Sequence, residues 1–184
     1  GLYGAGRHRR EVRAGERLLR PLRREDRVSE KPLRVLFICT GNSARSQMAE
    51  AILRHLSRGR IEVASAGSHP RLEIHPMARE AVAKILQIEM SGQYPKGFDG
   101  FLSQRFDYVI SVCDRAAEFC PIFPGHPTRI RWSLDDPAEA RATDDEKRRA
   151  FERTARDLVQ RIRIWMSLPA VSSRTGVDPV GHAI

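Results

Sequence analysis

The sequence lacks any long apolar run and contains few cysteines. No apolar segment approaches the roughly 20 residues needed to cross a bilayer, the longest being 35–39 and 108–113. No apolar stretch follows the arginines near the N-terminus, which argues against a secretory signal. Three cysteines are an odd number that does not suit a fully disulfide-bonded secreted protein. We therefore expect a soluble, cytoplasmic protein with reduced thiols and no membrane partner.

Metal-ligand motifs and acidic residues are also scarce. The chain has no Cys-x2-Cys pair and its six histidines lack ligand spacing, so we expect no metal. Acidic residues number 23 against 32 basic ones, a formal charge of +9. Residues 1–30 hold nine arginines and five acidic residues, a net +4. Because the remainder is only mildly basic, a nucleic-acid partner is not favoured, whereas a small oxyanion substrate is.

The 184 residues, 41% of them hydrophobic, are enough for a single domain. We divide the chain into a basic, flexible extension (1–31), a domain (32–168) and a flexible tail (169–184), and we expect a monomer. Apolar, β-rich runs predict buried strands at 33–38, 61–64 and 108–112, and apolar residues at helical spacing predict helices at 47–57, 76–86 and 144–166. This alternation predicts an α/β domain with a parallel sheet covered on both faces.

The loop between the first strand and the first helix carries the strongest chemical signal. Five residues separate Cys39 from Arg45, and Ser46 follows directly. Successive backbone N–H groups in such a loop, with the positive end of the following helix, bind a tetrahedral oxyanion and lower a thiol pKa. We expect Cys39 to be a thiolate at neutral pH, Ser46 to donate to its sulfur, and Arg45 to bind two oxyanion oxygens.

The expected oxyanion-binding residues are Thr40, Gly41, Asn42, Ser43, Ala44, Arg45 and Ser46. Gly41 would let the backbone turn tightly, and Asn42 would adopt a left-handed conformation. The alternative is a buried structural cysteine before an ordinary helix cap.

The segment 35–50, VLFICTGNSARSQMAE, resembles the active-site loop of low-molecular-weight tyrosine phosphatases and of thioredoxin-coupled arsenate reductases. The resemblance covers residues 33–168 and includes the turn Ser65-Ala66-Gly67. It implies a three-layer α/β fold with a four-stranded parallel sheet flanked by helices. It also implies that Cys39 is the catalytic nucleophile.

Such a nucleophile needs a proton donor for the departing oxygen. Both families carry an Asp directly before Pro in the region of Trp132 to Pro137, so the resemblance assigns the general acid to Asp136, beside Asp135. Proline fixes the backbone just after it. The alternative is a turn that only caps the following helix.

The cysteines Cys113 and Cys120 are the feature that distinguishes the reductase family from the phosphatase family. Cys113 closes the strand 108–112 and should face the same crevice as Cys39, because functional groups gather at the carboxyl ends of parallel strands. If 114–119 is helical, the two cysteines lie about 10 Å apart along it. A disulfide requires Cα atoms within roughly 7 Å, so forming it would require this segment to unwind. Inert buried thiols are the alternative.

The paired cysteines resemble those of thioredoxin-coupled arsenate reductases, and this resemblance implies reduction of arsenate to arsenite. Cys39 would attack arsenate, Asp136 would protonate the leaving oxygen, and Cys113 would attack the arsenic-bearing Cys39. Cys120 would then attack Cys113, leaving a disulfide for thioredoxin to reduce. The catalytic set is thus Cys39, Arg45, Cys113, Cys120 and Asp136, with thioredoxin as external reductant, no bound cofactor and a possible side phosphatase activity.

Two features of the sequence depart from the family patterns. Some reductases bind potassium through Asn, Glu, Ser and Asp, and here Asn42, Glu50 and Ser65 match whereas Lys96 replaces the Asp. We therefore expect no potassium requirement. The residues after Pro137 are Ala138-Glu139-Ala140, without the aromatics that would grip a phosphotyrosine ring.

Three alternatives remain open. The chain could be a tyrosine phosphatase whose extra cysteines protect the nucleophile, or a reductase that uses a low-molecular-weight thiol. It could also be a regulatory oxyanion-binding module whose arginine-rich extension contacts nucleic acid. Cys39, Arg45 and Asp136 together argue against pure binding.

Overall fold

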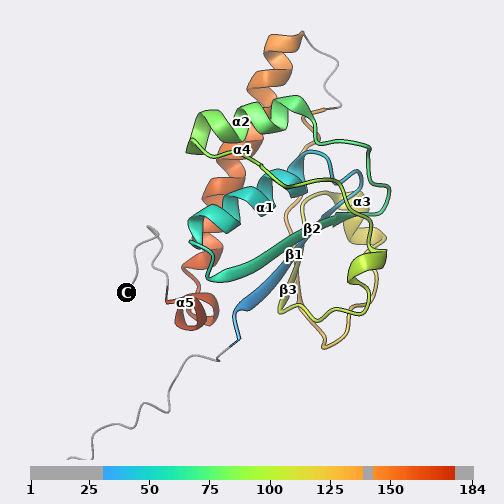
Figure 1. Cartoon of the computed structure of the whole chain (residues 1–184), viewed down its shortest axis with the longest axis vertical. Coiled ribbons are helices and arrows are strands. Elements are labelled where there is room, and N and C mark those ends of the chain that lie inside the picture. The colour runs from blue at the N-terminus through green and yellow to red at the C-terminus, as the bar shows by residue number, and fades with distance from the viewer. Residues whose placement is uncertain (1–30, 139–142, 177–184) are drawn as a thin grey trace, which may run out of the picture.

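The computed structural model describes residues 31–138 and 143–176 (Figure 1). The strands are β1 (Leu33–Cys39), β2 (Ile61–Gly67), β3 (Tyr108–Ser111) and β4 (Thr128–Arg131). The helices are α1 (Arg45–Leu56), α2 (Pro76–Leu86), α3 (Asp114–Glu118), α4 (Asp144–Met166) and α5 (Pro169–Thr175), with a 3-10 turn η1 (Asp99–Phe101). The predicted alternation of strands and helices is confirmed.

The four strands form one parallel sheet in the order β2-β1-β3-β4. The apolar strand β1 lies inside the sheet, where both of its edges are paired and all but Arg34 of its residues are buried. In the register, Cys39 pairs with Gly67 of β2, and Ile38 pairs with Ser111 of β3. The carboxyl ends of these three strands therefore lie level at one edge of the sheet.

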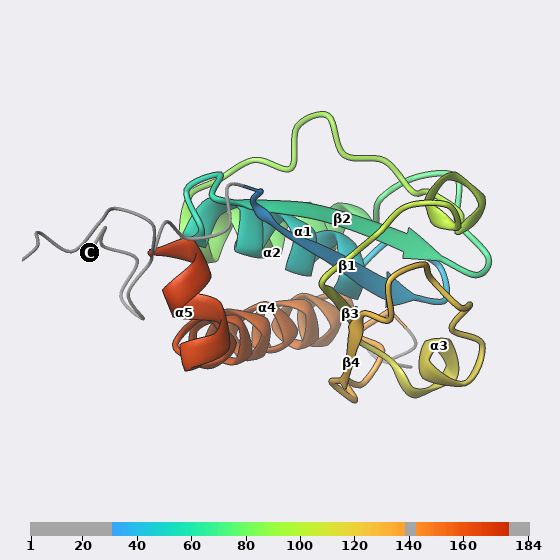
Figure 2. The same ribbon diagram turned by 90° about the horizontal axis from the view of Figure 1, so that it is seen from below.

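Helices cover both faces of the sheet, as predicted. Helix α4 packs on α1 and α2, and Figure 2 shows the three together on one side. Tyr108 of β3 contacts Trp165 of α4 edge to face at 5.1 Å, whereas Val109 lines a pocket with Ala117 of α3. Because successive side chains of a strand point to opposite faces, α3 covers the face away from α4. The three-layer fold is confirmed.

The expected flexible tail is wrong for residues 169–175, which form helix α5. Pro169 suits the first turn of a helix, and Val171 is fully buried. The Arg174 guanidinium lies 2.7 Å from Asp107, and Arg60 donates to the Gly176 carbonyl at 2.5 Å. One buried valine and two charge-assisted contacts thus order a segment whose composition suggested disorder. Residues 177–184 and the extension 1–30 lie outside the described residues.

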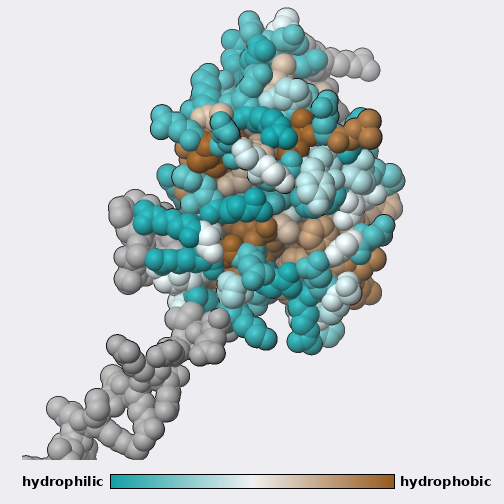
Figure 3. Space-filling view, viewed as in Figure 1, coloured by the Kyte–Doolittle hydropathy of each residue, from teal (hydrophilic) through white to brown (hydrophobic). Residues whose placement is uncertain are grey.

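The surface in Figure 3 is mostly hydrophilic, with smaller hydrophobic patches between the polar side chains. The largest fully buried side chains, such as Phe37, Phe151 and Leu158, lie in the core between the sheet and the helices. Within residues 31–138 and 143–176, no helix combines the length and apolar character needed to span a bilayer.

Candidate active site

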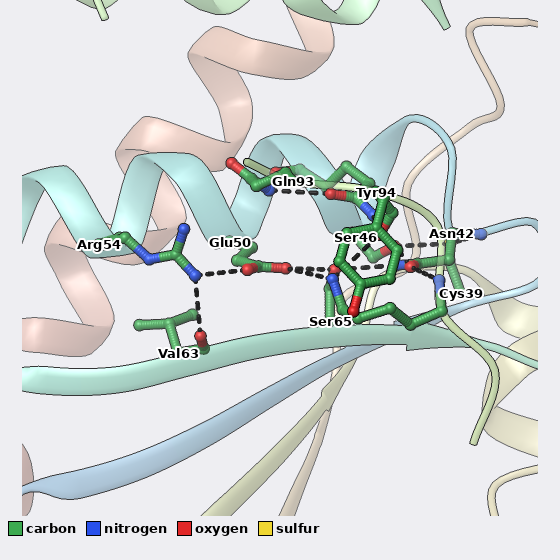
Figure 4. Close-up of polar contacts among 11 residues, drawn as sticks. Cys39, Asn42, Ser46, Glu50, Arg54, Val63, Ser65, Gln93 and Tyr94 are labelled. Carbon is green, nitrogen blue, oxygen red and sulfur yellow. Dashed lines mark hydrogen bonds and ion pairs between the residues drawn. The ribbon is translucent and has the colours of Figure 1, made fainter. Parts of the chain in front are cut away.

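Cys39 is the last residue of β1, and the loop that follows folds back around its sulfur. The Asn42 backbone N–H donates to Cys39 Sγ at 3.0 Å, and Ser46 Oγ lies 2.8 Å from the same sulfur (Figure 4). Asn42 has the predicted left-handed conformation, with φ at +43°. Helix α1 begins at Arg45, two residues before the predicted start, so Ser46 belongs to its first turn.

Ser46 is oriented as a donor to the nucleophile. The Asn42 Nδ2 amide donates to Ser46 Oγ at 2.8 Å, so the hydroxyl acts as acceptor toward Asn42. Its own proton is then free for the contact with Cys39 Sγ. The predicted Ser46-to-sulfur hydrogen bond therefore fits the contacts.

Two glycines lie where neighbouring atoms approach the loop closely. A Cβ at Gly41 would lie 3.2 Å from the Arg71 side chain, a tight contact that a small shift of neighbouring side chains can relieve. A Cβ at Gly67, at the end of β2, would lie only 2.5 Å from the Thr40 carbonyl oxygen. The adjoining segment 68–75 is bonded to the loop by backbone contacts such as Arg71 N–H to Gly41 O at 2.9 Å. The loop is thus held from both sides.

The expectation of a Cys39 thiolate at neutral pH does not match the balance of effects in this structure. Burial raises the pKa of Cys39 above the usual thiol value, and the hydrogen bonds from Ser46 lower it only in part. Arg45, which is paired with Asp136, lowers the pKa least among the causes. Ser46 is therefore the main group in the loop that favours the thiolate.

Replacing Ser46 with alanine should slow alkylation of Cys39 by iodoacetamide at neutral pH. The thiolate is the reactive form, and losing this donor raises the Cys39 pKa further. Each unit by which the pKa rises should slow alkylation at neutral pH about tenfold. In both proteins the rate should keep rising with pH beyond the range of an ordinary thiol. Peptide mass spectrometry would measure it, with the exposed Ser91→Ala as control. Equal rates in Ser46→Ala and the parent chain would contradict this.

Arg45 and Asp136, 91 positions apart, meet beside the loop. Arg45 donates to the Leu134 carbonyl at 2.8 Å and to Asp136 Oδ2 at 2.5 Å, and it is 9% exposed. The other Asp136 oxygen accepts from the Ala138 backbone N–H at 3.0 Å. Thr143 caps α4 with a complete capping box, so Asp136 does not serve as that cap. The structure thus brings the proposed acid to the predicted oxyanion-binding arginine.

Cys113 lies at the same sheet edge as Cys39, as predicted. It is 4% exposed, occupies the N-cap position of α3, and its Sγ lies 3.7 Å from Thr40 Oγ1 of the nucleophile loop. It is also close enough to raise the pKa of the Cys39 thiol, after burial has made the largest contribution. The second thiol therefore stands beside the loop that holds the first.

Cys120 lies just beyond α3, half-buried, in a pocket lined also by Ile38, Val109 and Ala117. Burial raises the pKa of its thiol, and the sulfur faces the Pro121 carbonyl at 3.6 Å. All three cysteines are free thiols, with α3 between the second and third. A bond between Cys113 and Cys120 would require this short helix to rearrange, as the sequence predicts.

Three predicted residues and two glutamines that were not predicted lie behind the loop. Glu50 and Ser65 are bonded to each other at 2.5 Å, and the Lys96 ammonium lies 3.5 Å from Glu50, so these three predicted residues do come together. Gln47 and Gln93, joined by a 2.8 Å hydrogen bond, were not predicted. Their side chains are 46 positions apart, and no local pattern signals such a contact.

The chain matches the low-molecular-weight phosphotyrosine protein phosphatase family over residues 34–171. It is 38% identical to the arsenate reductase of Halalkalibacterium halodurans over 133 residues, which cover 71% of this chain and 93% of that one. The thioredoxin-dependent arsenate reductase of Corynebacterium glutamicum has a TM-score of 0.52 at 32% identity, covering 77% of this chain and 67% of that one. A low-molecular-weight protein tyrosine phosphatase from T. tengcongensis shares the fold, with a TM-score of 0.61 at 23% identity, over 73% of this chain and 98% of that one.

The fold and the sulfur-centred loop thus define a cysteine-dependent enzyme of the α/β class. The chain belongs to the low-molecular-weight phosphotyrosine protein phosphatase family.

Proposed function

We propose that this protein reduces arsenate to arsenite in the cytoplasm, with thioredoxin as its reductant. The observation that carries the proposal is a second thiol, Cys113, against the loop that holds the nucleophile, 3.7 Å from Thr40 Oγ1. Hydrolysis of a phosphate ester has no use for that thiol. Relatives named arsenate reductases, one of them thioredoxin-dependent, support the same reading.

The first step is attack of the Cys39 thiolate on arsenic. A sulfur–arsenic bond forms and one oxygen leaves as water after accepting protons, one of them from Asp136. The backbone donors of the loop and the Arg45 guanidinium would stabilise the negative oxygens. For this, Asp136 must leave its contact with Arg45 and take up a proton.

The second step transfers electrons. The Cys113 thiolate attacks Cys39 Sγ, forming a disulfide while the two electrons of the sulfur–arsenic bond remain on arsenic, which departs as arsenite. Cys120 then attacks Cys113, so that Cys39 leaves as a thiolate and a Cys113–Cys120 disulfide remains. Thioredoxin supplies the two electrons that restore both thiols. Rearrangement of α3 would bring the Cys120 sulfur out of its pocket and toward solvent.

The direct test supplies arsenate, thioredoxin, thioredoxin reductase and NADPH to the full chain. We expect NADPH loss to match arsenite formed one to one, and mass spectrometry of the protein without thioredoxin to find a Cys113–Cys120 disulfide. The absence of both would refute the proposal. Replacing thioredoxin with a low-molecular-weight thiol in the same assay distinguishes the two reductants.

A phosphatase side activity follows from the same site, because Cys39, Arg45 and Asp136 suffice to cleave a phosphate monoester. Strong hydrolysis of an aryl phosphate without arsenate reduction would make the chain a tyrosine phosphatase instead. Ala138, the described residue directly after Pro137, offers no aromatic ring to grip a phosphotyrosine.

We also propose that the enzyme needs no bound potassium. The Lys96 ammonium already stands 3.5 Å from the Glu50 carboxylate, beside Ser65. The rate of arsenate reduction should be the same in potassium chloride and in choline chloride at equal ionic strength. A clear loss of activity in choline chloride would contradict this.

The chain is expected to act as a monomer, which light scattering would check.

A further inference from the structure

An ionic cluster centred on a buried carboxylate lies directly behind the nucleophile loop (Figure 4). At its centre is Glu50 of α1, whose side chain is only 4% exposed. Its carboxylate accepts from Ser65 Oγ at 2.5 Å, pairs with Arg54 at 2.5 Å and faces the Lys96 ammonium at 3.5 Å. A buried carboxylate is costly unless it is paired, so this cluster depends on its cations.

An unbroken chain of contacts joins this cluster to the nucleophile. Ser65 Oγ donates to Glu50 and can therefore accept from Asn42 Nδ2, which lies 2.9 Å away. Asn42 in turn donates its backbone N–H to Cys39 Sγ at 3.0 Å. The carboxylate thus fixes the hydroxyl, the hydroxyl fixes the amide, and the amide holds the residue whose left-handed backbone faces the sulfur.

Lys96 is anchored on the same asparagine through its backbone. Its N–H donates to Asn42 Oδ1 at 2.7 Å, and its carbonyl accepts from Gly67 N–H at 2.8 Å. Its ammonium donates to the Tyr94 carbonyl at 3.0 Å and lies 4.9 Å from the centre of the Tyr94 ring. Lys96 therefore contacts Asn42 directly through its backbone. Its ammonium is also linked to Asn42 indirectly, through Glu50 and Ser65.

The two cations of the cluster are not equivalent. The Lys96 side chain is 19% exposed, whereas that of Arg54 is 47% exposed. Water and salt screen an exposed ion pair much more than a buried one. The contact with Lys96, although longer, should therefore be the less screened of the two.

We propose that Lys96 is a positioning residue for the nucleophile, acting through Glu50, Ser65 and Asn42 to hold the loop in the conformation that donates to Cys39. The proposal rests on Cys39 being the nucleophile of the proposed function, but not on the identity of the oxyanion. Its tests therefore use no arsenate, and their failure is distinct from failure of the reductase assignment.

The first test replaces Lys96 with methionine in the full chain and follows alkylation of Cys39 against pH by peptide mass spectrometry. We expect alkylation at neutral pH to be about tenfold slower, because the midpoint of the profile moves upward by about one pH unit. Hydrolysis of p-nitrophenyl phosphate should lose kcat with little change in KM. Lys96→Arg should recover much of both. An unchanged profile in a folded Lys96→Met protein would overturn the proposal.

Two controls separate this role from general effects. Lys84→Met also removes a lysine from an ion pair with a glutamate, but the Lys84 side chain is 65% exposed on the surface. Both the alkylation profile and the hydrolysis rate should therefore stay as in the parent chain. Arg54→Met should change them less than Lys96→Met. An equal or larger effect of Arg54→Met would assign the role to Arg54 and overturn the proposal for Lys96.

Glu50→Gln distinguishes positioning from simple charge and serves also if Lys96→Met does not fold. Removing a negative charge would by itself favour the thiolate and speed alkylation. Loss of the carboxylate that holds Ser65 and Lys96 should instead slow it. Faster alkylation in Glu50→Gln would overturn the positioning role, and slower alkylation would support it.

Discussion

Replacing Cys113 with serine should abolish release of arsenite, whereas replacing Cys120 with serine should permit one arsenite per protein molecule and then stop. Without Cys113, nothing attacks the arsenic-bearing Cys39, so the first adduct persists. Without Cys120, arsenite leaves but the protein remains as a Cys39–Cys113 disulfide. Rapid-quench measurement of arsenite against protein concentration would distinguish the two arrest points.

The control for both variants is hydrolysis of an aryl phosphate, which needs neither residue and should continue in each. The parent chain with thioredoxin and its reductase should show many turnovers in the same arsenate assay. Sustained arsenate turnover by either serine variant would rule out the relay. Intact protein mass would identify the accumulated adduct or disulfide.

Replacing Asp136 with asparagine should lower kcat for arsenate reduction and for aryl phosphate hydrolysis by about 10²–10⁴-fold, the usual contribution of a general acid. The KM should not rise, because the change also removes the negative charge that competes with the substrate for Arg45. Steady-state kinetics with both substrates would measure the two constants separately.

The matched control is Asp135→Asn, the same change at the neighbouring position. Asp135 is exposed, whereas Asp136 is partly buried against Arg45. Its rate constants should stay close to those of the parent chain. A loss at Asp135 as large as that at Asp136 would mean that the resemblance assigned the acid to the wrong carboxylate.

Local sequence patterns predicted those elements well in which the pattern extends over many residues. Helices α2 and α4 have the predicted bounds, because helical spacing of apolar residues extends over many positions. Strand β2 continues to Gly67, three residues past its predicted end, because pairing with β1 extends it through small residues. Pairing between distant segments leaves little trace in composition. Helix α5 was missed because the contacts that order it are with Arg60 and Asp107, which are distant in the sequence.

The site was predictable to the extent that topology determines it. Cys39 ends β1 and Cys113 follows the adjacent parallel strand β3 by two residues, so their location at one sheet edge follows from the fold. The pairing of Arg45 with Asp136 and the raised pKa of Cys39 did not follow, because both depend on side-chain geometry and burial. A motif indicates which groups are present, but the balance between their charges is set by three-dimensional packing.

The contact between Arg45 and Asp136 makes the carboxylate and an incoming oxyanion competitors for the same guanidinium. Occupation of the loop by an anion would displace the carboxylate from the guanidinium. Arrival of the substrate would thereby release the acid from its resting contact at the moment when the reaction needs it.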